Sequence, residues 1–416
     1  MPILPRTPEL EAQVAALMRE ALPDLESGDQ KRPREILDPV NLQDLRTAIG
    51  TTRLFRILIT NACIFTCDYC PMRRGRKMRR LYVEPARLAR VFMHAVRRGW
   101  AQGLFVTSGI PKNSVWAMDR MIELVATVRD TYGFTGYIHA KALPGAEPAQ
   151  IAALAARVDR LSFNLEAVCD AALHKIAPQK KMADGLAVIT QAAAVRATAI
   201  AETPAAKKSG GAAIYIPLRS GLTTQFVVTP DGASDRELLT MTGDLYARKL
   251  LHHAHYAAFR PIADTPMENS PETPIERERR LYEADYLLRQ YGFSAGELPY
   301  EKSGRLPLGI DVKLAWALCH PERFPIELLT ADRETLLRVP GCGPRGVDRL
   351  LWSRRASPPR DEKDLLRLGF AIKRCTPFLT LRGRRFGASR LQLPLFAGAE
   401  ITPQKHLYQV SPGTFR

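Results

Sequence analysis

The feature that most constrains the fold is an alternation of strand-like and helix-like segments between residues 50 and 260. Period-two or short apolar patterns predict strands at residues 53–59, 103–109, 134–140, 159–165, 224–229 and 249–259. Helical periodicity predicts helices at residues 85–101, 114–131, 147–157, 182–199 and 235–246. This order favours an α/β fold with a parallel sheet and right-handed crossovers, and about six βα units suit a partial (β/α)6 barrel.

Three cysteines follow the first predicted strand, in the run Cys63-Ile-Phe-Thr-Cys67-Asp-Tyr-Cys70. The spacing C-x3-C-x2-C puts three thiols in one loop, enough for three corners of a cubic iron–sulfur cluster. Such a cluster normally takes a cysteine at all four irons, so one iron would stay open for chemistry. Because the loop follows a strand, we expect the site at the carboxyl end of the sheet, where active sites collect.

Two other interpretations of the cysteine run exist. Structural zinc needs four closed ligands, but no fourth Cys or His lies within twenty residues of Cys70. Unreactive core thiols are the second alternative, although Asn61, Asp68 and the arginines nearby are not core composition. The spacing therefore favours the cluster.

The C-x3-C-x-aromatic-C run resembles the signature of the radical S-adenosylmethionine (SAM) superfamily. The resemblance implies a [4Fe-4S] cluster on Cys63, Cys67 and Cys70, with SAM on the open iron. An electron from a donor such as flavodoxin or ferredoxin would cleave SAM and yield a 5′-deoxyadenosyl radical that takes hydrogen from the substrate.

The resemblance also implies which residues contact SAM. Thr107-Ser108-Gly109 stands where the superfamily has a glycine-rich turn, although Ile110 replaces its usual acidic residue. Ser162, Asn164 and Glu166 alternate along one predicted strand, so we expect them on one face, toward a ligand rather than solvent. By resemblance, the SAM-binding set is Tyr69, Thr107, Ser108, Gly109, Ser162, Asn164 and Glu166.

A second motif lies at residues 336–351 and resembles the helix-hairpin-helix module. Pro340-Gly341-Cys342-Gly343 would form the hairpin, and Pro344 suits the first position of the following helix. Bare N–H groups there would bind phosphate, with added charge from Arg338, Arg345 and Arg349. The alternative is an ordinary turn between two core helices. Residues 364–379 look like a degenerate second copy.

The chain is basic, with 60 Lys and Arg against 43 Asp and Glu and a net charge of +17, which favours a polyanionic partner. Part of the excess directly follows the cysteine run, in Arg73, Arg74, Arg76 and Lys77. We expect these side chains to bind nucleic-acid phosphates near the site; a solvated loop is the alternative.

Weaker signals stand elsewhere. His252, His253 and His255 lack partners for a metal site and fit a surface or substrate-facing role, while Tyr256, Phe259 and Arg260 could stack on bases. Cys169 could donate hydrogen to a substrate radical. By default, Cys169, Cys319, Cys342 and Cys375 are interpreted as small core residues.

The predicted organisation has five parts. They are an N-terminal helical extension (1–50, with helices at 7–23 and 34–49), the barrel (51–260), a proline-rich linker and helix (261–302), an all-α helix-hairpin-helix domain (303–381) and a tail (382–416), with a loop at 203–222.

No run approaches the eighteen apolar residues of a membrane span, so we expect no membrane partner. The N-terminus is unlike a signal peptide, and seven cysteines with three in a metal motif indicate a reducing, cytoplasmic location.

Most of the chain is similar to a family of radical SAM proteins of DNA modification or repair, associated with a uracil-DNA-glycosylase-like partner. The similarity includes Ser162-Phe-Asn-Leu-Glu166, Ala258-Phe-Arg-Pro-Ile262 and the segment from Asp311 to the hairpin. It implies a nucleic-acid substrate, with DNA favoured over RNA. A transfer-RNA modification enzyme, or a nucleic-acid-binding protein with a structural or redox-sensing cluster, are the alternatives.

Overall fold

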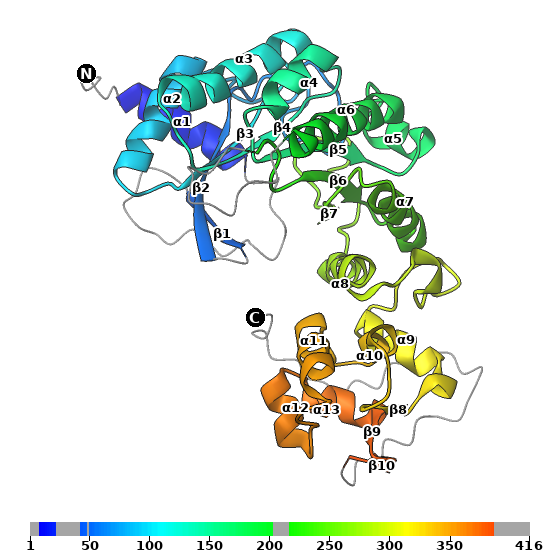
Figure 1. Cartoon of the computed structure of the whole chain (residues 1–416). Helices are drawn as coiled ribbons and strands as arrows, with labels where there is room; N and C mark the ends of the chain where they lie inside the picture. Colours follow the sequence, from blue (N-terminus) through cyan, green and yellow to red (C-terminus); the bar gives the residue numbers. More distant parts are fainter. Residues whose placement is uncertain (1–7, 22–41, 48–49, 203–215, 387–416) are drawn as a thin grey trace. The chain divides into compact units, whose positions relative to one another are not determined.

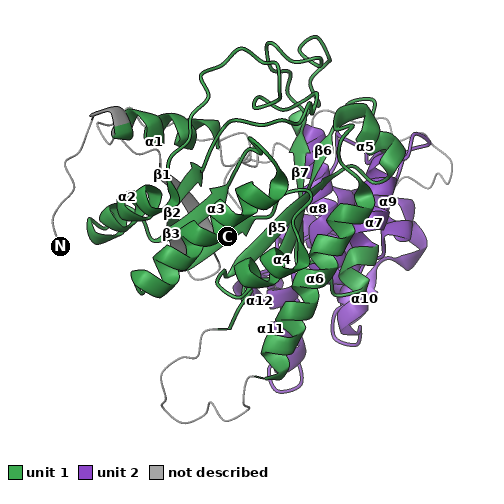
Figure 2. Ribbon diagram, turned by 90° about the horizontal axis from the view of Figure 1, so that it is seen from above, with its two compact units in different colours: residues 1–233, 244–275 green, residues 234–243, 276–416 purple. Residues whose placement is uncertain are grey.

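The computed structural model describes residues 8–21, 42–47, 50–202 and 216–386 (Figure 1). It divides into two compact units (Figure 2): unit 1 comprises Met1–Ala233 and Asp244–Ile275, and unit 2 comprises Ser234–Gly243 and Glu276–Arg416. Most of the predicted loop at 203–222 and of the tail at 382–416 lies outside the described residues. No helix among the described residues has both the length and the apolar character needed to cross a membrane.

Unit 1 contains a seven-stranded sheet whose strands lie side by side in chain order. The first pair is antiparallel and every later pair is parallel, so six parallel strands form an open half-barrel. This confirms the predicted partial (β/α)6 barrel. The strands are β1 (Leu42–Thr47), β2 (Gly50–Leu58), β3 (Gly103–Thr107), β4 (Tyr137–Lys141), β5 (Arg160–Glu166), β6 (Leu222–Val228) and β7 (His253–Ala258).

The strand β1 corrects the part of the predicted helix at residues 34–49 that the structure describes, whereas residues 34–41 and 48–49 lie outside the described residues. Its backbone pairs with β2, for example Leu45 with Thr52. An edge strand leaves N–H and C=O groups unpaired, and covering that edge outweighs a weak local helical preference.

One helix precedes the strands of unit 1, and others connect them. They are α1 (Pro8–Glu20), α2 (Pro85–Arg97), α3 (Ser114–Ala126, continued by the π-helix Thr127–Thr131), α4 (Pro148–Ala155), α5 (Asp170–Ile176), α6 (Met182–Ala201) and α7 (Asp235–Ala247). Of these, α5 was not predicted. Asn113 caps α3 by accepting from Trp116 N at 2.8 Å.

The two faces of the sheet differ in chemistry. Helices α2, α3, α4 and α6 lie on one side (Figure 1). There Phe55 packs on Phe92 of α2 with ring centroids 5.7 Å apart, and Gly185 of α6 lies so close to Phe163 that a Cβ would come within 2.6 Å. The opposite face carries the alternate residues of each strand, which are mostly polar in β4 to β7.

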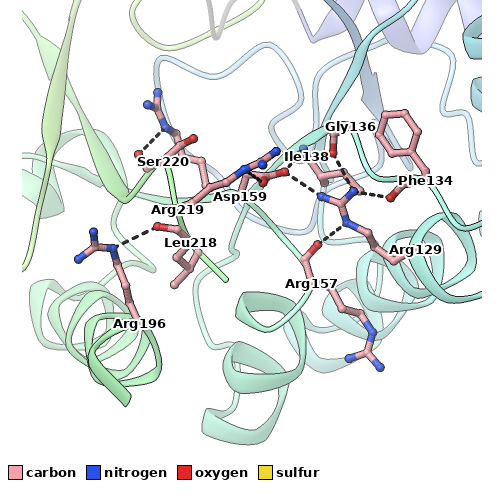
Figure 3. Close-up of polar contacts among 11 residues, drawn as sticks. Arg129, Phe134, Gly136, Ile138, Arg157, Asp159, Arg196, Leu218, Arg219 and Ser220 are labelled. Carbon is pink, nitrogen blue, oxygen red and sulfur yellow. Dashed lines mark hydrogen bonds and ion pairs between the residues drawn. The ribbon is translucent and has the colours of Figure 1, made fainter. Parts of the chain in front are cut away.

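An ion-pair cluster joins the amino ends of β4 and β5 (Figure 3). The fully buried Asp159 accepts a hydrogen bond from Ile138 N at 2.7 Å and pairs with Arg129 at 2.8 Å and with Arg219. The Arg129 guanidinium also donates to the carbonyls of Phe134 and Gly136. These contacts lie at the end of the strands opposite to the cysteine loop.

Unit 2 is mostly helical. A buried ion pair between Arg277 and Asp235, at 2.8 Å, joins its first long helix to the first turn of α7. Its helices are α8 (Ile275–Tyr291), α9 (Val312–Cys319), α10 (Arg333–Arg338), α11 (Pro344–Ser353), α12 (Glu362–Leu368) and α13 (Ile372–Cys375), with short 3-10 turns at Ala295–Glu297, Pro321–Arg323 and Thr376–Phe378.

The prediction that this part is all-α is wrong. A small sheet is present, with strands β8 (Ile326–Glu327), β9 (Leu379–Leu381) and β10 (Arg384–Arg385). The Glu327 carboxylate accepts hydrogen bonds from the N–H groups of Arg382 and Gly383 at the turn before β10. Residues far apart in sequence thus complete a sheet too short to be visible as a periodic pattern.

Candidate active site

The cysteine loop lies at the carboxyl end of β2 and is tied to neighbouring loops by its backbone. Ile64 N donates to Ile110 O after β3 at 2.7 Å, and Asp68 N donates to Ile176 O at the end of α5 at 2.8 Å. Gln179 adds a bond from its side-chain amide to Thr66 Oγ1 at 2.6 Å. Segments that follow β3 and β5 therefore hold the loop in place.

Close backbone contacts fix the start of the loop. The buried Asn61 side chain accepts from Leu81 N at 2.6 Å and donates to Arg79 O at 2.9 Å. Gly109 N donates to Thr60 O at 2.7 Å, and a Cβ on Gly109 would lie 2.3 Å from Ala62 O. The glycine is therefore required by the approach of the two loops, while SAM contacts from Thr107, Ser108 and Gly109 stay a prediction.

Two arginines that follow the loop donate hydrogen bonds to backbone carbonyls in and around it. Arg73 donates to Thr66 O and Cys67 O and pairs with Asp68 at 3.3 Å. Arg80 donates to Asn61 O at 2.7 Å and to three further carbonyls.

The predicted phosphate-binding residues divide into two kinds. Arg76 donates to Pro71 O and Ala263 O, so Arg73 and Arg76 both hold the local backbone. Arg74 and Lys77 are exposed. Contact of these four side chains with nucleic-acid phosphates stays a prediction.

The three thiols have the environment of buried ligands. Cys67 is buried and Cys63 and Cys70 are half-buried; burial raises the pKa of Cys67 and raises that of Cys70 to about 12. Thiolates there need a cation to compensate their charge, which a metal cluster supplies.

The geometry does not favour a single metal ion. Among the described residues, no group of three His, Cys, Asp or Glu side chains is arranged to bind one ion. A [4Fe-4S] cluster takes each cysteine on a separate iron, so its ligands do not converge on one point.

An ion pair that sequence reasoning missed lies beside the cysteines. Lys180 Nζ is 2.8 Å from Glu166 Oε1, and both side chains are largely buried. Burial opposes the charged form of Lys180, but Glu166 and the nearby Cys67 hold its pKa above the usual value. Burial, followed by Glu166, holds the pKa of Tyr69 well above its usual value, which places that ring in the same group. Nothing in the local sequence distinguishes Lys180 from Lys181.

The predicted alternation of Ser162, Asn164 and Glu166 is wrong at its last member. A register shift between Phe163 and Glu166 pairs Glu166 with Phe226, and Glu166 adopts a left-handed φ of 66°. The buried Glu166 Oε2 and Asn164 Oδ1 have no hydrogen-bond partner among the described residues. Such buried acceptors fit the hydroxyl and ammonium groups of SAM.

The residues of the weaker sequence signals differ in how deeply they are buried. Tyr256 and Phe259 are buried, so the expectation that they stack on bases is wrong. His252 Nδ1 accepts from Leu222 N at 3.2 Å, whereas His253 and His255 lie together with ring centroids 4.6 Å apart. Cys342 and Cys375 are buried as expected.

Two further cysteines depart from expectation, because Cys169 and Cys319 are exposed. Neither therefore acts as the small core residue that the sequence predicts by default.

Unit 2 carries a second candidate site in two helical hairpins. Gly341, with φ 80°, joins α10 to α11, and Gly369, with φ 95°, joins α12 to α13. The turns contact each other, because Ala371 N donates to Gly341 O at 2.9 Å. A Cβ on Gly341 would lie 2.8 Å from Ala371 O, so only glycine fits there.

The arginines around the first hairpin play different roles. Arg345 and Arg349 are exposed on α11. Arg338 is buried, with its guanidinium 3.9 Å from the Phe293 ring centroid and 2.9 Å from Glu297. The expectation that Arg338 adds surface charge is therefore wrong.

No family model matches the chain, and no curated protein matches it. Similar solved structures include the FeFe-hydrogenase maturase HydG from Carboxydothermus hydrogenoformans (11% identity, TM-score 0.44, 57% of this chain and 51% of HydG). Others are methylornithine synthase PylB (12%, 0.42, 64% and 67%) and a radical SAM methyltransferase from Sphaerobacter thermophilus (14%, 0.40, 60% and 75%). The chain spans about half the length of HydG. With every one of these TM-scores below 0.5, a functional assignment depends on the chain's own residues.

Proposed function

We propose that this protein is a radical SAM enzyme with a [4Fe-4S] cluster on Cys63, Cys67 and Cys70. The observation that carries the proposal is the C-x3-C-x2-C loop at the carboxyl end of β2 in a six-stranded parallel half-barrel. When bound, the cluster and SAM supply one-electron cleavage of the sulfonium and a 5′-deoxyadenosyl radical. The chain holds the cysteine loop through Gly109 and Arg73 and presents the acceptors of Asn164 and Glu166 beside it.

Anaerobic reconstitution tests this proposal. We expect the reconstituted protein, given SAM and dithionite, to release 5′-deoxyadenosine, and Cys67→Ala to lose both the cluster absorbance and the product. Cys319→Ala, which removes an exposed cysteine of unit 2, is the matched control and retains both. Equal yields of 5′-deoxyadenosine from Cys67→Ala and the unsubstituted protein would refute the proposed radical SAM activity.

We further propose that the substrate is nucleic acid, with DNA favoured over RNA. Two glycine-turned hairpins in contact, with Arg345 and Arg349 exposed beside the first, support a helix-hairpin-helix unit that binds phosphates. The net charge of +17 supports the same class of partner. A uracil-DNA-glycosylase-like protein and a flavodoxin or ferredoxin are the proposed protein partners.

Deuterated substrates distinguish the alternatives. Turnover with deuterated DNA should transfer label into 5′-deoxyadenosine, whereas label from deuterated transfer RNA alone would identify an RNA-modifying enzyme. A nucleic-acid-binding protein with a redox-sensing cluster would bind both polymers and yield no 5′-deoxyadenosine.

A further inference from the structure

The most exposed large apolar side chain among the described residues lies in the hairpin unit. Trp352, in the last turn of α11, is 88% exposed, and Leu366 of α12 follows at 63%. Aromatic side chains stabilise a fold mainly when they are buried, so the fold gains little from this ring. A single exposed apolar residue is ordinary, and its neighbours decide what it could bind.

Two exposed arginines share one side of α11 with Trp352. Arg345 and Arg349 precede it by seven and three residues, a spacing that puts side chains on the same side of a helix. The buried Val347 and Leu350 form the opposite side, which packs into the core of unit 2. At a rise of 1.5 Å per residue, Arg345 and Trp352 are about 10 Å apart along the helix axis.

The charge on this side of α11 is positive. Asp348 is the one acidic residue of the helix, and Arg333 Nε neutralises its carboxylate at 2.8 Å. Arg349 Nη1 lies 3.5 Å from Leu368 O, at the turn of the second hairpin. The exposed side of α11 therefore extends from the first hairpin to the second.

These neighbours favour a nucleic acid over a protein as the occupant. A protein that buried the indole would gain most where further apolar residues surround it, but the exposed residues that share its side of the helix are Arg345 and Arg349. A nucleic-acid strand offers phosphates to the arginines and a flat base to the ring. In a duplex both faces of each base are covered by its neighbours, so only an unpaired or terminal base can stack on a protein side chain.

We propose that Trp352 stacks on an unpaired base of the nucleic acid, while Arg345 and Arg349 bind the phosphates beside it. The inference rests on the proposed function and specifies it further. The hairpins bind backbone without reading sequence, and the indole adds a preference for a strand that is single or locally unpaired.

Fluorescence anisotropy of the full-length protein with three labelled oligodeoxynucleotides tests this proposal. The three are a single strand, its fully paired duplex and the same duplex with one bulged thymine. We expect the bulged duplex to bind at least about fivefold more tightly than the paired duplex. Trp352→Ala and Trp352→Leu should abolish that preference, whereas Trp352→Phe should retain most of it, because only a ring can stack. Leu366→Ala, at the next most exposed apolar side chain, is the control and should leave the preference unchanged.

Equal affinities of the unsubstituted protein for the paired and bulged duplexes would overturn the proposal, as would a Trp352→Leu protein that still prefers the bulge. Sedimentation velocity tests the other occupant. Self-association that Trp352→Ala abolishes, with unchanged affinity for DNA, would assign the ring to a second copy of this chain and also overturn the proposal.

Arg345→Ala separates failure of the stacking from failure of the proposed function. Weaker binding of this variant to all three oligonucleotides, with no effect of Trp352→Leu, would leave the hairpin as a DNA site and remove only the stacking. If the unsubstituted protein bound none of the three, both the stacking and the proposed DNA substrate would fail.

Discussion

At the scale of single residues, the active site depends on groups whose roles differ from what their type suggests. Gly109 permits a close approach between two loops, and Arg73 holds carbonyls of the cysteine loop instead of solvent anions. Glu166 forms an ion pair with Lys180, and the backbone of Glu166 is left-handed. Each role follows from a contact with a distant part of the chain.

Gly109→Ala should displace the cysteine loop, because its Cβ would lie 2.3 Å from Ala62 O. We expect a loss of about 1–3 kcal/mol in unfolding free energy and a lower iron content after reconstitution. Urea denaturation and iron analysis measure these effects. Gly296→Ala, where a Cβ meets nothing within 4 Å, is the control and should change neither.

At the scale of elements, ion pairs and register decide how the half-barrel is held. A cluster around Asp159 joins the amino ends of β4 and β5, away from the cysteines (Figure 3). At the other end of β5 a bulge changes the direction of Glu166. One strand thus carries a stabilising contact at one end and a candidate site residue at the other, as is common in barrels.

Asp159→Asn should destabilise the fold by about 3 kcal/mol, because the largely buried Arg129 loses its counter-charge. The urea midpoint measures the loss. Asp130→Asn removes an ion pair of a half-exposed carboxylate with Arg157 and should cost less than about 1 kcal/mol. Equal losses in the two variants would contradict a stabilising role for the Asp159 cluster.

In unit 2, Lys313 of α9 is buried and donates to Cys342 O in the first hairpin at 2.7 Å. Burial lowers its pKa to about 7, although Cys342 and Asp311 favour the charged form. Between that value and the pKa of about 10.4 in the unfolded chain, the unfolded state binds one more proton, so this lysine makes stability rise with pH. Below pH 7 both states are protonated and its contribution is constant.

The unfolding free energy of the unsubstituted protein should therefore gain up to about 1.4 kcal/mol per pH unit, relative to Lys313→Met, between pH 7 and 8.5. Urea unfolding at a series of pH values measures the difference. The comparison removes the opposing effect of Cys342, whose pKa is raised by burial. A constant difference over this range would show that Lys313 titrates as it does in the unfolded chain.

At the scale of the whole molecule, the chain combines a half-barrel unit and a hairpin unit, and each carries one proposed task. The cysteine loop belongs to unit 1, whereas the paired hairpins belong to unit 2. We therefore expect a substitution in one unit to leave the activity proposed for the other unit unchanged.

Arg345→Ala and Arg349→Ala should weaken binding to DNA of any sequence and reduce the salt slope of the affinity by about one each. Formation of 5′-deoxyadenosine without nucleic acid should stay the same. Arg323→Ala, at another exposed arginine of unit 2, is the control for charge alone. An unchanged salt slope in the α11 variants would show that the hairpin does not contact DNA.

The sequence by itself determined the βα order, the half-barrel and the position of Cys63, Cys67 and Cys70 after its first parallel strand. These features depend on local periodicity and spacing, which neighbouring residues fix. Only the tertiary structure decided the pairing of Lys180 with Glu166, the strand β1 and the contact between His139 and Ser162. Such contacts join residues distant in sequence, and their geometry depends on strand register, which a one-residue bulge in β5 is enough to change.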